Sequence, residues 1–99
     1  MGVQLLYFDG CPHWAVADEL LRIALSSLGR ESESIEHVLV VSDEQAEALK
    51  FIGSPTFLVD GVDPFAVGDE PLGLACRLFN TPGGMAGSPT IAQMLEVLS

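Results

Sequence analysis

The residue best suited to nucleophilic chemistry in this sequence is Cys11, which follows an apolar run and directly precedes Pro12 and His13. A cysteine between a strand and a helix meets unpaired backbone N–H groups and the positive end of the helix dipole, which favour the thiolate over the thiol. Because the thiolate is the reactive form, we expect Cys11 to act as a nucleophile. His13 assists if it is protonated, or donates a hydrogen bond to the sulfur if it is neutral. We therefore predict Cys11 and His13 as catalytic residues, against the plainer interpretation of His13 as an exposed residue at a helix start.

The second cysteine, Cys76, lies in the apolar stretch Leu74–Phe79 and is predicted as a buried core residue. A disulfide between Cys11 and Cys76 needs Cα atoms within about 7 Å, and the sequence does not favour that arrangement. The first twenty residues contain no Lys or Arg, so we expect no secretory signal and a cytoplasmic protein. In that compartment both cysteines are expected to be thiols.

Metal binding is the main competing chemistry for these side chains. Asp9, Cys11 and His13 are neighbours in the sequence, but a structural zinc site needs four ligands at characteristic spacing, so we expect no metal there. A soft, thiophilic metal held by Cys11 with Cys76 needs fewer ligands, and this interpretation remains an alternative. No paired-carboxylate, Ser-His-Asp or phosphate-loop signature is found.

Composition limits the possible partners. The chain has 99 residues, of which 48% are hydrophobic and 18% charged, which predicts one globular domain over residues 1–99. Its formal net charge is −10. That charge repels a phosphate backbone and an anionic membrane surface, so we expect neither nucleic acid nor membrane as a partner.

Hydrophobic spacing and turn residues predict the elements that position Cys11. The first half of the chain predicts an alternation of strands and helices. These are a strand over Val3–Phe8, a helix over Pro12–Leu28 stopped by Gly29, a strand over Ile35–Val41, and a helix to about Ile52 with Ser42 and Gln45 as its capping box.

The tetrapeptide Gly-Ser-Pro-Thr occurs twice, and its context differs between the two copies. The copy at Gly53–Thr56 opens a strand over Phe57–Val59. In the copy at Gly87–Thr90, Ser88 is predicted as the N-cap of a last helix, with Pro89 at its first position.

The region between the two copies predicts one more strand and a surface loop. Leu74–Phe79 predicts the strand, and Asn80–Gly87 an irregular loop. The full order is βαβαββα, an α/β fold with a mixed four-stranded sheet flanked by three helices.

The segments Cys11-Pro12-His13-Trp14 and Gly53-Ser54-Pro55-Thr56 resemble the thioredoxin-like superfamily, and the resemblance covers nearly the whole chain. The small size and element order are most similar to glutaredoxins. The resemblance implies a thioredoxin-like fold with Pro55 as a cis-proline against Cys11. It also implies that the backbone of Ser54 pairs with an extended thiol substrate. The residues predicted to bind substrate are Pro12, Trp14, Ser54, Pro55 and Thr56.

The sequence departs from the superfamily pattern at Trp14, which stands where the resolving cysteine of a Cys-x-x-Cys motif would be. A disulfide within the motif cannot form, so we predict monothiol–disulfide exchange through Cys11, as in monothiol glutaredoxins. Gly83-Gly84 resembles the diglycine with which glutaredoxins bind glutathione, although Met85 departs from that pattern. No bound cofactor is expected, and glutathione or another low-molecular-weight thiol is a candidate co-substrate.

Other interpretations stay open beside thiol exchange. The chain could be a non-catalytic, protein-binding domain of the same fold, or a carrier of a thiophilic metal or another electrophile. Trp14 could simply cover the core, and Thr56 could be an ordinary strand residue. The expected partner is a small thiol or a protein disulfide, and the expected state is a monomer or weak dimer.

Overall fold

The centre of the fold is a mixed three-stranded sheet. The computed structural model describes residues 2–11, 13–30, 32–66 and 72–98. Strand β1 (Val3–Tyr7) pairs in parallel with β2 (Ile35–Leu39) and antiparallel with β3 (Thr56–Val59), so the strand order is β2-β1-β3. The apolar β1 takes the middle position because both of its faces are covered by helices.

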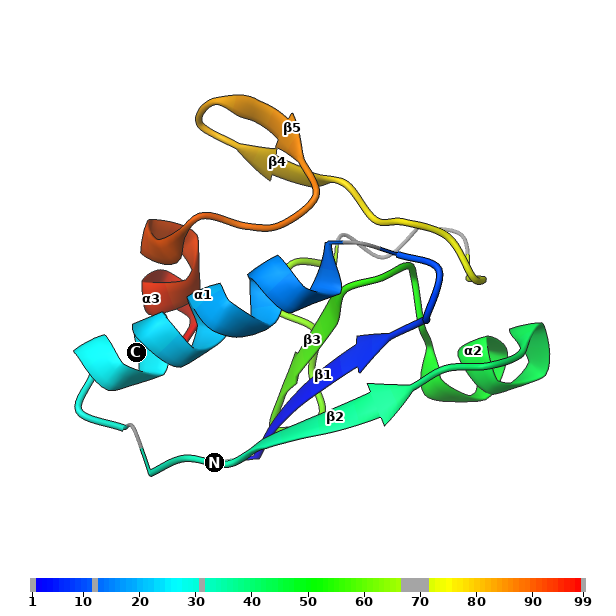
Figure 1. Cartoon of the computed structure of the whole chain (residues 1–99), viewed down its shortest axis with the longest axis horizontal. Coiled ribbons are helices and arrows are strands. Elements are labelled where there is room, and N and C mark those ends of the chain that lie inside the picture. The colour runs from blue at the N-terminus through cyan, green and yellow to red at the C-terminus, as the bar shows by residue number, and fades with distance from the viewer. Residues whose placement is uncertain (1, 12, 31, 67–71, 99) are drawn as a thin grey trace.

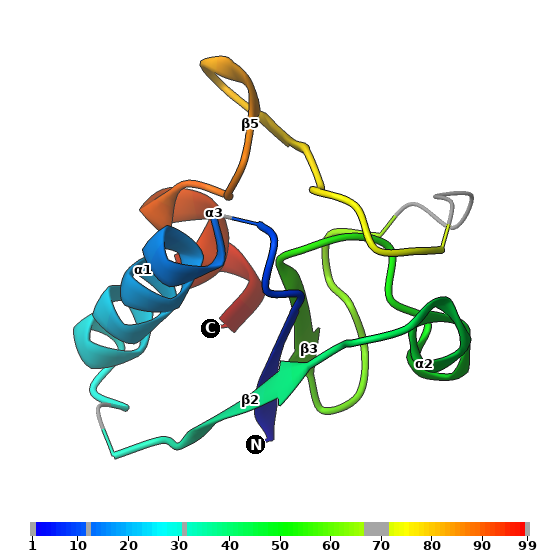
Figure 2. The ribbon, with the colours of Figure 1, turned by 45° about the vertical axis from the view of Figure 1, so that its right-hand side comes forward.

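Helices cover both faces of this sheet. Helices α1 (Trp14–Ser27) and α3 (Ile91–Leu98) lie on one side, and α2 (Asp43–Leu49) lies on the other (Figures 1 and 2). Among the described residues, no helix combines the length and apolar character needed to span a membrane. The chain is therefore a small α/β domain with a mixed sheet and three helices in its described ranges.

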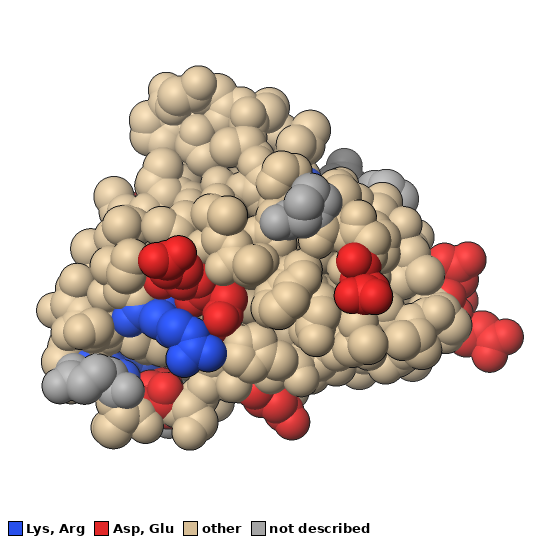
Figure 3. Space-filling view, in the orientation of Figure 1, with Lys and Arg blue, Asp and Glu red and all other residues tan. Residues whose placement is uncertain are grey.

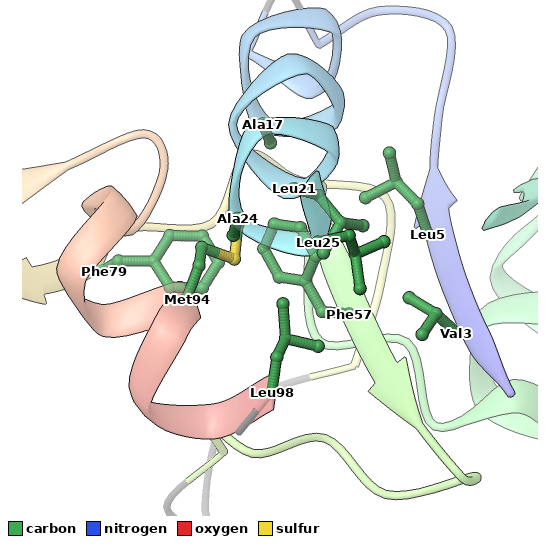
Figure 4. Close-up of a cluster of buried hydrophobic side chains, with 10 residues drawn as sticks. All are labelled: Val3, Leu5, Ala17, Leu21, Ala24, Leu25, Phe57, Phe79, Met94 and Leu98. Atoms are coloured by element: carbon green, nitrogen blue, oxygen red, sulfur yellow. The ribbon is translucent and has the colours of Figure 1, made fainter. Parts of the chain in front are cut away.

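Two hydrophobic clusters hold the layers together, one on each face of β1. Because side chains alternate along a strand, Leu5 joins the larger cluster under α1 and α3, and Leu6 joins the smaller one under α2. Figure 4 shows the larger cluster. Its buried members are Val3, Leu5, Ala17, Leu21, Ala24, Leu25, Phe57, Phe79, Met94 and Leu98. The smaller cluster contains Leu6, Val40, Ala46 and Phe51.

The prediction of a fourth strand in this sheet is wrong. In place of a strand over Leu74–Phe79, β4 (Phe79–Thr81) and β5 (Gly84–Ala86) form a separate two-stranded hairpin. Residues 74–78 contribute one isolated bridge, between Cys76 and Ser54. The physical reason is Arg77, which interrupts the apolar run and turns to an ion pair with Asp63.

The hairpin also corrects the prediction of an irregular loop over Asn80–Gly87. The chain reverses between Thr81 and Gly84, where Gly84 has φ +110° and the Thr81 hydroxyl donates to the Gly84 carbonyl. A positive φ suits glycine because it has no Cβ, so the Gly83-Gly84 pair closes the turn.

The N-cap of α2 agrees with the prediction from the sequence, and the N-cap of α3 does not. Ser42 caps α2 as predicted, since its Oγ accepts from the Gln45 N–H at 3.1 Å, and α2 then ends at Leu49, short of Ile52. The prediction of Ser88 as the cap of α3 is wrong. Instead, the Thr90 Oγ1 accepts from the Gln93 N–H at 3.2 Å, and the Gln93 Oε1 accepts from the Thr90 N–H at 2.9 Å. This reciprocal capping box starts α3 at Ile91.

Candidate thiol site

Cys11 lies in the turn that joins β1 to α1. Its N–H donates to the Phe8 carbonyl at 3.2 Å, and its side chain is buried, with the residue 2% exposed. Helix α1 begins at Trp14 with His13 in the N-cap position. Cys11 therefore precedes the N-cap, and α1 starts later than the helix predicted from residue 12 onward. The turn between Phe8 and Cys11 accounts for this difference.

The loop that opens β3 lies against Cys11. The Ser54–Pro55 peptide bond is cis, in agreement with the expectation for Pro55. The Cys11 Sγ lies 3.4 Å from the Ser54 carbonyl oxygen, to which the thiol donates. Thr56 is buried, and its hydroxyl donates to the Gly53 carbonyl at 2.6 Å, within the same turn. The Ser54 hydroxyl is buried and has no hydrogen-bond partner among the described residues.

The structure brings Cys76 to the same place, although the two cysteines are far apart in the sequence. The Cys76 Sγ lies 3.1 Å from the Cys11 Sγ, and both cysteines are free thiols. Cys76 is exposed, so its prediction as a core residue is wrong. We call residues 72–78 the Cys76 segment. In Figures 1 and 2 this segment (yellow) crosses the same end of the sheet as the connection between β1 and α1 (blue).

Backbone hydrogen bonds place the Cys76 segment beside Ser54. The Ser54 N–H donates to the Ala75 carbonyl at 2.8 Å, and the Ser54 carbonyl accepts from the Arg77 N–H at 2.9 Å. Together they form a parallel bridge between Ser54 and Cys76. The backbone groups of Ser54 that the superfamily resemblance assigns to a thiol substrate are therefore occupied by the chain itself.

Side-chain contacts of Arg77 also hold the Cys76 segment in place. Arg77 forms an ion pair with Asp63, with 2.7 Å between Nη1 and Oδ2, and its guanidinium lies 4.5 Å from the centre of the Phe79 ring. Gly53 allows the close approach, because a Cβ there would lie 2.9 Å from the Arg77 Cβ. These residues were not predicted from the sequence. A signal for Arg77 does exist, since a lone arginine in an apolar run needs a buried acidic partner.

The hydrogen bond between the two thiols gives them different roles, because Cys76 donates it and Cys11 accepts it. Contact with the Cys11 sulfur, to which the Cys76 thiol donates, raises the pKa of Cys76, and partial desolvation of this exposed thiol adds a smaller increase. A thiolate on Cys76 would lose the hydrogen bond that its thiol donates to Cys11, and the Cys11 thiol donates in turn to the Ser54 carbonyl. The two thiols and the Ser54 carbonyl therefore form one hydrogen-bonded chain, in which Cys76 donates to Cys11 and Cys11 donates to Ser54.

Of the other predicted site residues, Trp14 and His13 make contacts with neighbouring parts of the fold. Trp14 stacks on Tyr7 with 4.2 Å between ring centroids, and it packs against the larger core cluster. The His13 ring lies against Gly87, where a Cβ would come within 2.5 Å of it. Among the described hydrogen bonds, none joins His13 to Cys11. The substrate-binding prediction for Pro12 lies outside the described residues.

A cavity of about 490 Å³ opens beside Cys76, between the Cys76 segment and the β4–β5 hairpin. Its walls are mainly apolar, with Asn80, Gln93 and Arg77 as polar members, and Arg77 is already paired with Asp63. On the face shown in Figure 3, the basic atoms gather mainly over the C-terminal half of α1, away from the hairpin. The cavity therefore suits an uncharged group better than an anion.

Groups of three or more His, Cys, Asp or Glu side chains that could hold a metal ion are not found within the described ranges. Comparison of the chain with family models, curated proteins and solved structures found no match.

Proposed function

We propose that this chain is a thioredoxin-like protein that performs thiol–disulfide exchange, with Cys11 as the nucleophile. The observation that carries the proposal is the contact of the Cys11 sulfur with two other groups, the Cys76 thiol at 3.1 Å and the Ser54 carbonyl at 3.4 Å. A free cysteine in a core behaves as a small hydrophobe, whereas this buried cysteine contacts a second thiol that is exposed. Cys76 also offers a hydrogen-bond donor to the Cys11 sulfur, whose thiolate is the reactive form in thiol–disulfide exchange.

The reaction consists of two exchanges. The Cys11 thiolate attacks one sulfur of a disulfide, forms a mixed disulfide with it, and releases the other half as a thiolate that takes a proton from solvent. A thiol then attacks the mixed disulfide, restores Cys11, and leaves as part of a new disulfide. No net oxidation of the protein occurs in this cycle. Because Cys11 is 2% exposed, the groups that cover its sulfur, the Cys76 side chain among them, must move to admit the substrate.

The test uses the Cys76→Ser variant, in which Cys11 is the remaining cysteine. The reduced variant is mixed with hydroxyethyl disulfide, and the mixed disulfide is followed by intact mass. We expect a product heavier by one hydroxyethylthio group. We also expect it to form faster than the adduct of the matched Cys11→Ser variant, which keeps Cys76. Reaction of both variants in urea controls for reagent access. If Cys11 reacts in urea but not in the folded protein, the catalytic proposal is wrong, and a non-catalytic binding domain becomes the better interpretation.

A second candidate function is the binding of a thiophilic metal by the two sulfurs. The contact between the two sulfurs supports it, since two thiolates suffice for a soft ion such as Cu(I) once the sulfurs, 3.1 Å apart, separate to admit the metal. Titration of the reduced protein with Cu(I) against a competing chelator tests it. A tight one-to-one complex that is lost in both single-cysteine variants would favour a carrier. Binding no tighter than that of the variants would exclude it.

A further inference from the structure

The two sulfurs are close enough to form a bond with a small movement. They are 3.1 Å apart, and a disulfide bond is about 2.05 Å long, so an approach of about 1 Å joins them. Cys11 is buried and Cys76 is exposed. The exposed partner can therefore move toward the buried one without repacking the core.

The chain holds Cys76 at this position by contacts on both sides of it. Ser54 forms backbone hydrogen bonds with Ala75 before it and with Arg77 after it, at 2.8 and 2.9 Å. Arg77 is in turn held by its buried ion pair with Asp63. A surface cysteine without a role in the site would not require its two neighbours to be held by these contacts. The contacts keep a second thiol next to the nucleophile.

We propose that Cys76 is a resolving cysteine, which displaces the substrate from Cys11 and forms an intramolecular Cys11–Cys76 disulfide. This inference rests on the proposed function and extends it, because the protein then exchanges two electrons with its substrate. Trp14 stands where the first-helix motif would have its resolving thiol, and that thiol is supplied instead by Cys76, 65 positions after Cys11.

The steps balance as follows. The Cys11 thiolate attacks the substrate disulfide, which breaks its S–S bond and releases one thiolate that takes a proton from solvent. Cys76 then loses its proton to solvent, and its sulfur attacks the Cys11 sulfur of the mixed disulfide. The Cys11–Cys76 bond forms, and the second substrate thiolate leaves and is protonated by solvent. The substrate disulfide is thereby reduced to two thiols while the protein dithiol is oxidised. An external dithiol of low reduction potential, such as dithiothreitol in the assay, restores the protein.

The experiment compares wild-type protein with Cys76→Ser. Both reduced proteins react with hydroxyethyl disulfide, and samples are quenched with iodoacetamide at intervals. The intact mass of each sample is then measured by mass spectrometry. In wild type we expect a monomer two hydrogen atoms lighter than the reduced protein, with no alkylated cysteine. In Cys76→Ser the mixed disulfide should persist. Even a flexibly linked thiol has an effective concentration on the order of millimolar, so against about 10 µM free thiol the mixed disulfide should resolve about a hundredfold faster in wild type.

Three results would contradict the proposals, and they differ from one another. If the wild-type mixed disulfide persists as long as that of Cys76→Ser, Cys76 does not resolve it, and the proposed function of Cys11 stands. If neither protein forms an adduct on Cys11, the proposed function itself fails. If Cys11→Ser forms the adduct and Cys76→Ser does not, Cys76 is the attacking thiol and the assigned roles are wrong.

Discussion

Arg77 and Asp63 form a largely buried ion pair that ties the Cys76 segment to the loop after β3. The Arg77 Nη1 lies 2.7 Å from the Asp63 Oδ2, and the two side chains are 6% and 12% exposed. Asp63 also accepts a hydrogen bond from the Phe65 N–H at 2.9 Å, which orients its carboxylate. The position of Cys76 therefore depends on a charge pair formed by its neighbour in the sequence.

Replacing Arg77 should destabilise the protein and expose Cys11. Arg77→Gln leaves the Asp63 carboxylate buried without its partner, which costs about 3–5 kcal/mol of the free energy of unfolding. In the same variant, Cys11 should be alkylated faster in the folded protein, because the segment that covers it is released. Urea unfolding measures the first effect, and peptide mass spectrometry after a short pulse of iodoacetamide measures the second.

The matched control is Arg22→Gln. Arg22 also pairs with an aspartate, Asp18 at 3.1 Å, but its side chain is 60% exposed. Exposed pairs contribute about 0–1 kcal/mol, so this variant should unfold near the wild-type urea concentration. Equal losses of stability in Arg77→Gln and Arg22→Gln would show that the Arg77 pair does not fasten the segment.

Gly53 offers a second way to displace the Cys76 segment. An alanine there would place its Cβ 2.9 Å from the Arg77 Cβ and 3.2 Å from the Ala75 carbonyl oxygen, at a φ of +122°. Gly53→Ala should push the segment away and lower the yield of the Cys11–Cys76 disulfide under mild oxidation. Non-reducing peptide mapping measures that yield.

Gly84→Ala separates the two effects of the Gly53 substitution. Gly84 has a similar φ of +110°, but nothing lies within 4 Å of a Cβ built on it. This variant carries comparable backbone strain without the clash, so its disulfide yield should match that of wild type. If both alanine variants lose the disulfide equally, strain and not contact with the segment is responsible.

Much of the fold follows from local sequence signals. The apolar run that forms β1, the helical spacing of α1, and the Ser42–Gln45 capping box each specify an element without help from distant residues. The predicted fourth strand failed because periodicity does not show which partner a segment meets. Residues 74–78 are apolar enough for a strand, yet Arg77 turns them toward Asp63.

The site was predicted only in part, again because sequence patterns do not show which distant residues come into contact. Cys11 and Ser54 were singled out from their motifs, and the structure brings them together. The sequence does not predict the contact with Cys76, because that contact depends on a long-range bridge to Ser54 that no local pattern encodes. An exposed thiol beside a buried one is a tertiary property, which burial predicted from an apolar run does not reveal.

The pH dependence of Cys76 should reveal its hydrogen bond to Cys11. Because that contact raises the pKa of Cys76, the folded protein keeps this thiol protonated to a higher pH than the unfolded chain does. The contact therefore stabilises the fold below the ordinary cysteine pKa of about 8.5, and this contribution is lost as the pH rises through the raised value. Alkylation of Cys76 should begin at lower pH in Cys11→Ala than in wild type.

Measurement of that shift requires counting only molecules that are modified once, so that prior alkylation of Cys11 does not change the environment of Cys76. Peptide mass spectrometry over a pH series provides this count, and alkylation in urea gives the reference curve. Identical curves for Cys76 in wild type and Cys11→Ala would show that the two thiols do not interact in solution.

The charge of the low-molecular-weight substrate should matter to the exchange rate. The chain has four Lys and Arg residues against fourteen Asp and Glu, and Arg77, the cation at the cavity beside Cys76, is already paired. An anionic disulfide is therefore repelled and finds no free partner at the cavity wall. With Cys76→Ser, cystamine should react faster than neutral hydroxyethyl disulfide, and hydroxyethyl disulfide faster than glutathione disulfide. Each rate is divided by the rate of the same disulfide with free mercaptoethanol, which removes differences in intrinsic reactivity.

The dependence of the normalised rates on salt concentration tests whether the ranking of the three disulfides is electrostatic. At about 0.01 M ionic strength the screening length is about 30 Å, and at about 1 M it is about 3 Å. The normalised rates should therefore differ by about tenfold or more at low salt and converge at high salt. Glutathione, a candidate co-substrate on sequence grounds, would then be a poor one for this chain. A normalised rate for glutathione disulfide that equals or exceeds that of cystamine at low salt would mean that the substrate approaches Cys11 by a route that does not experience the acidic surface.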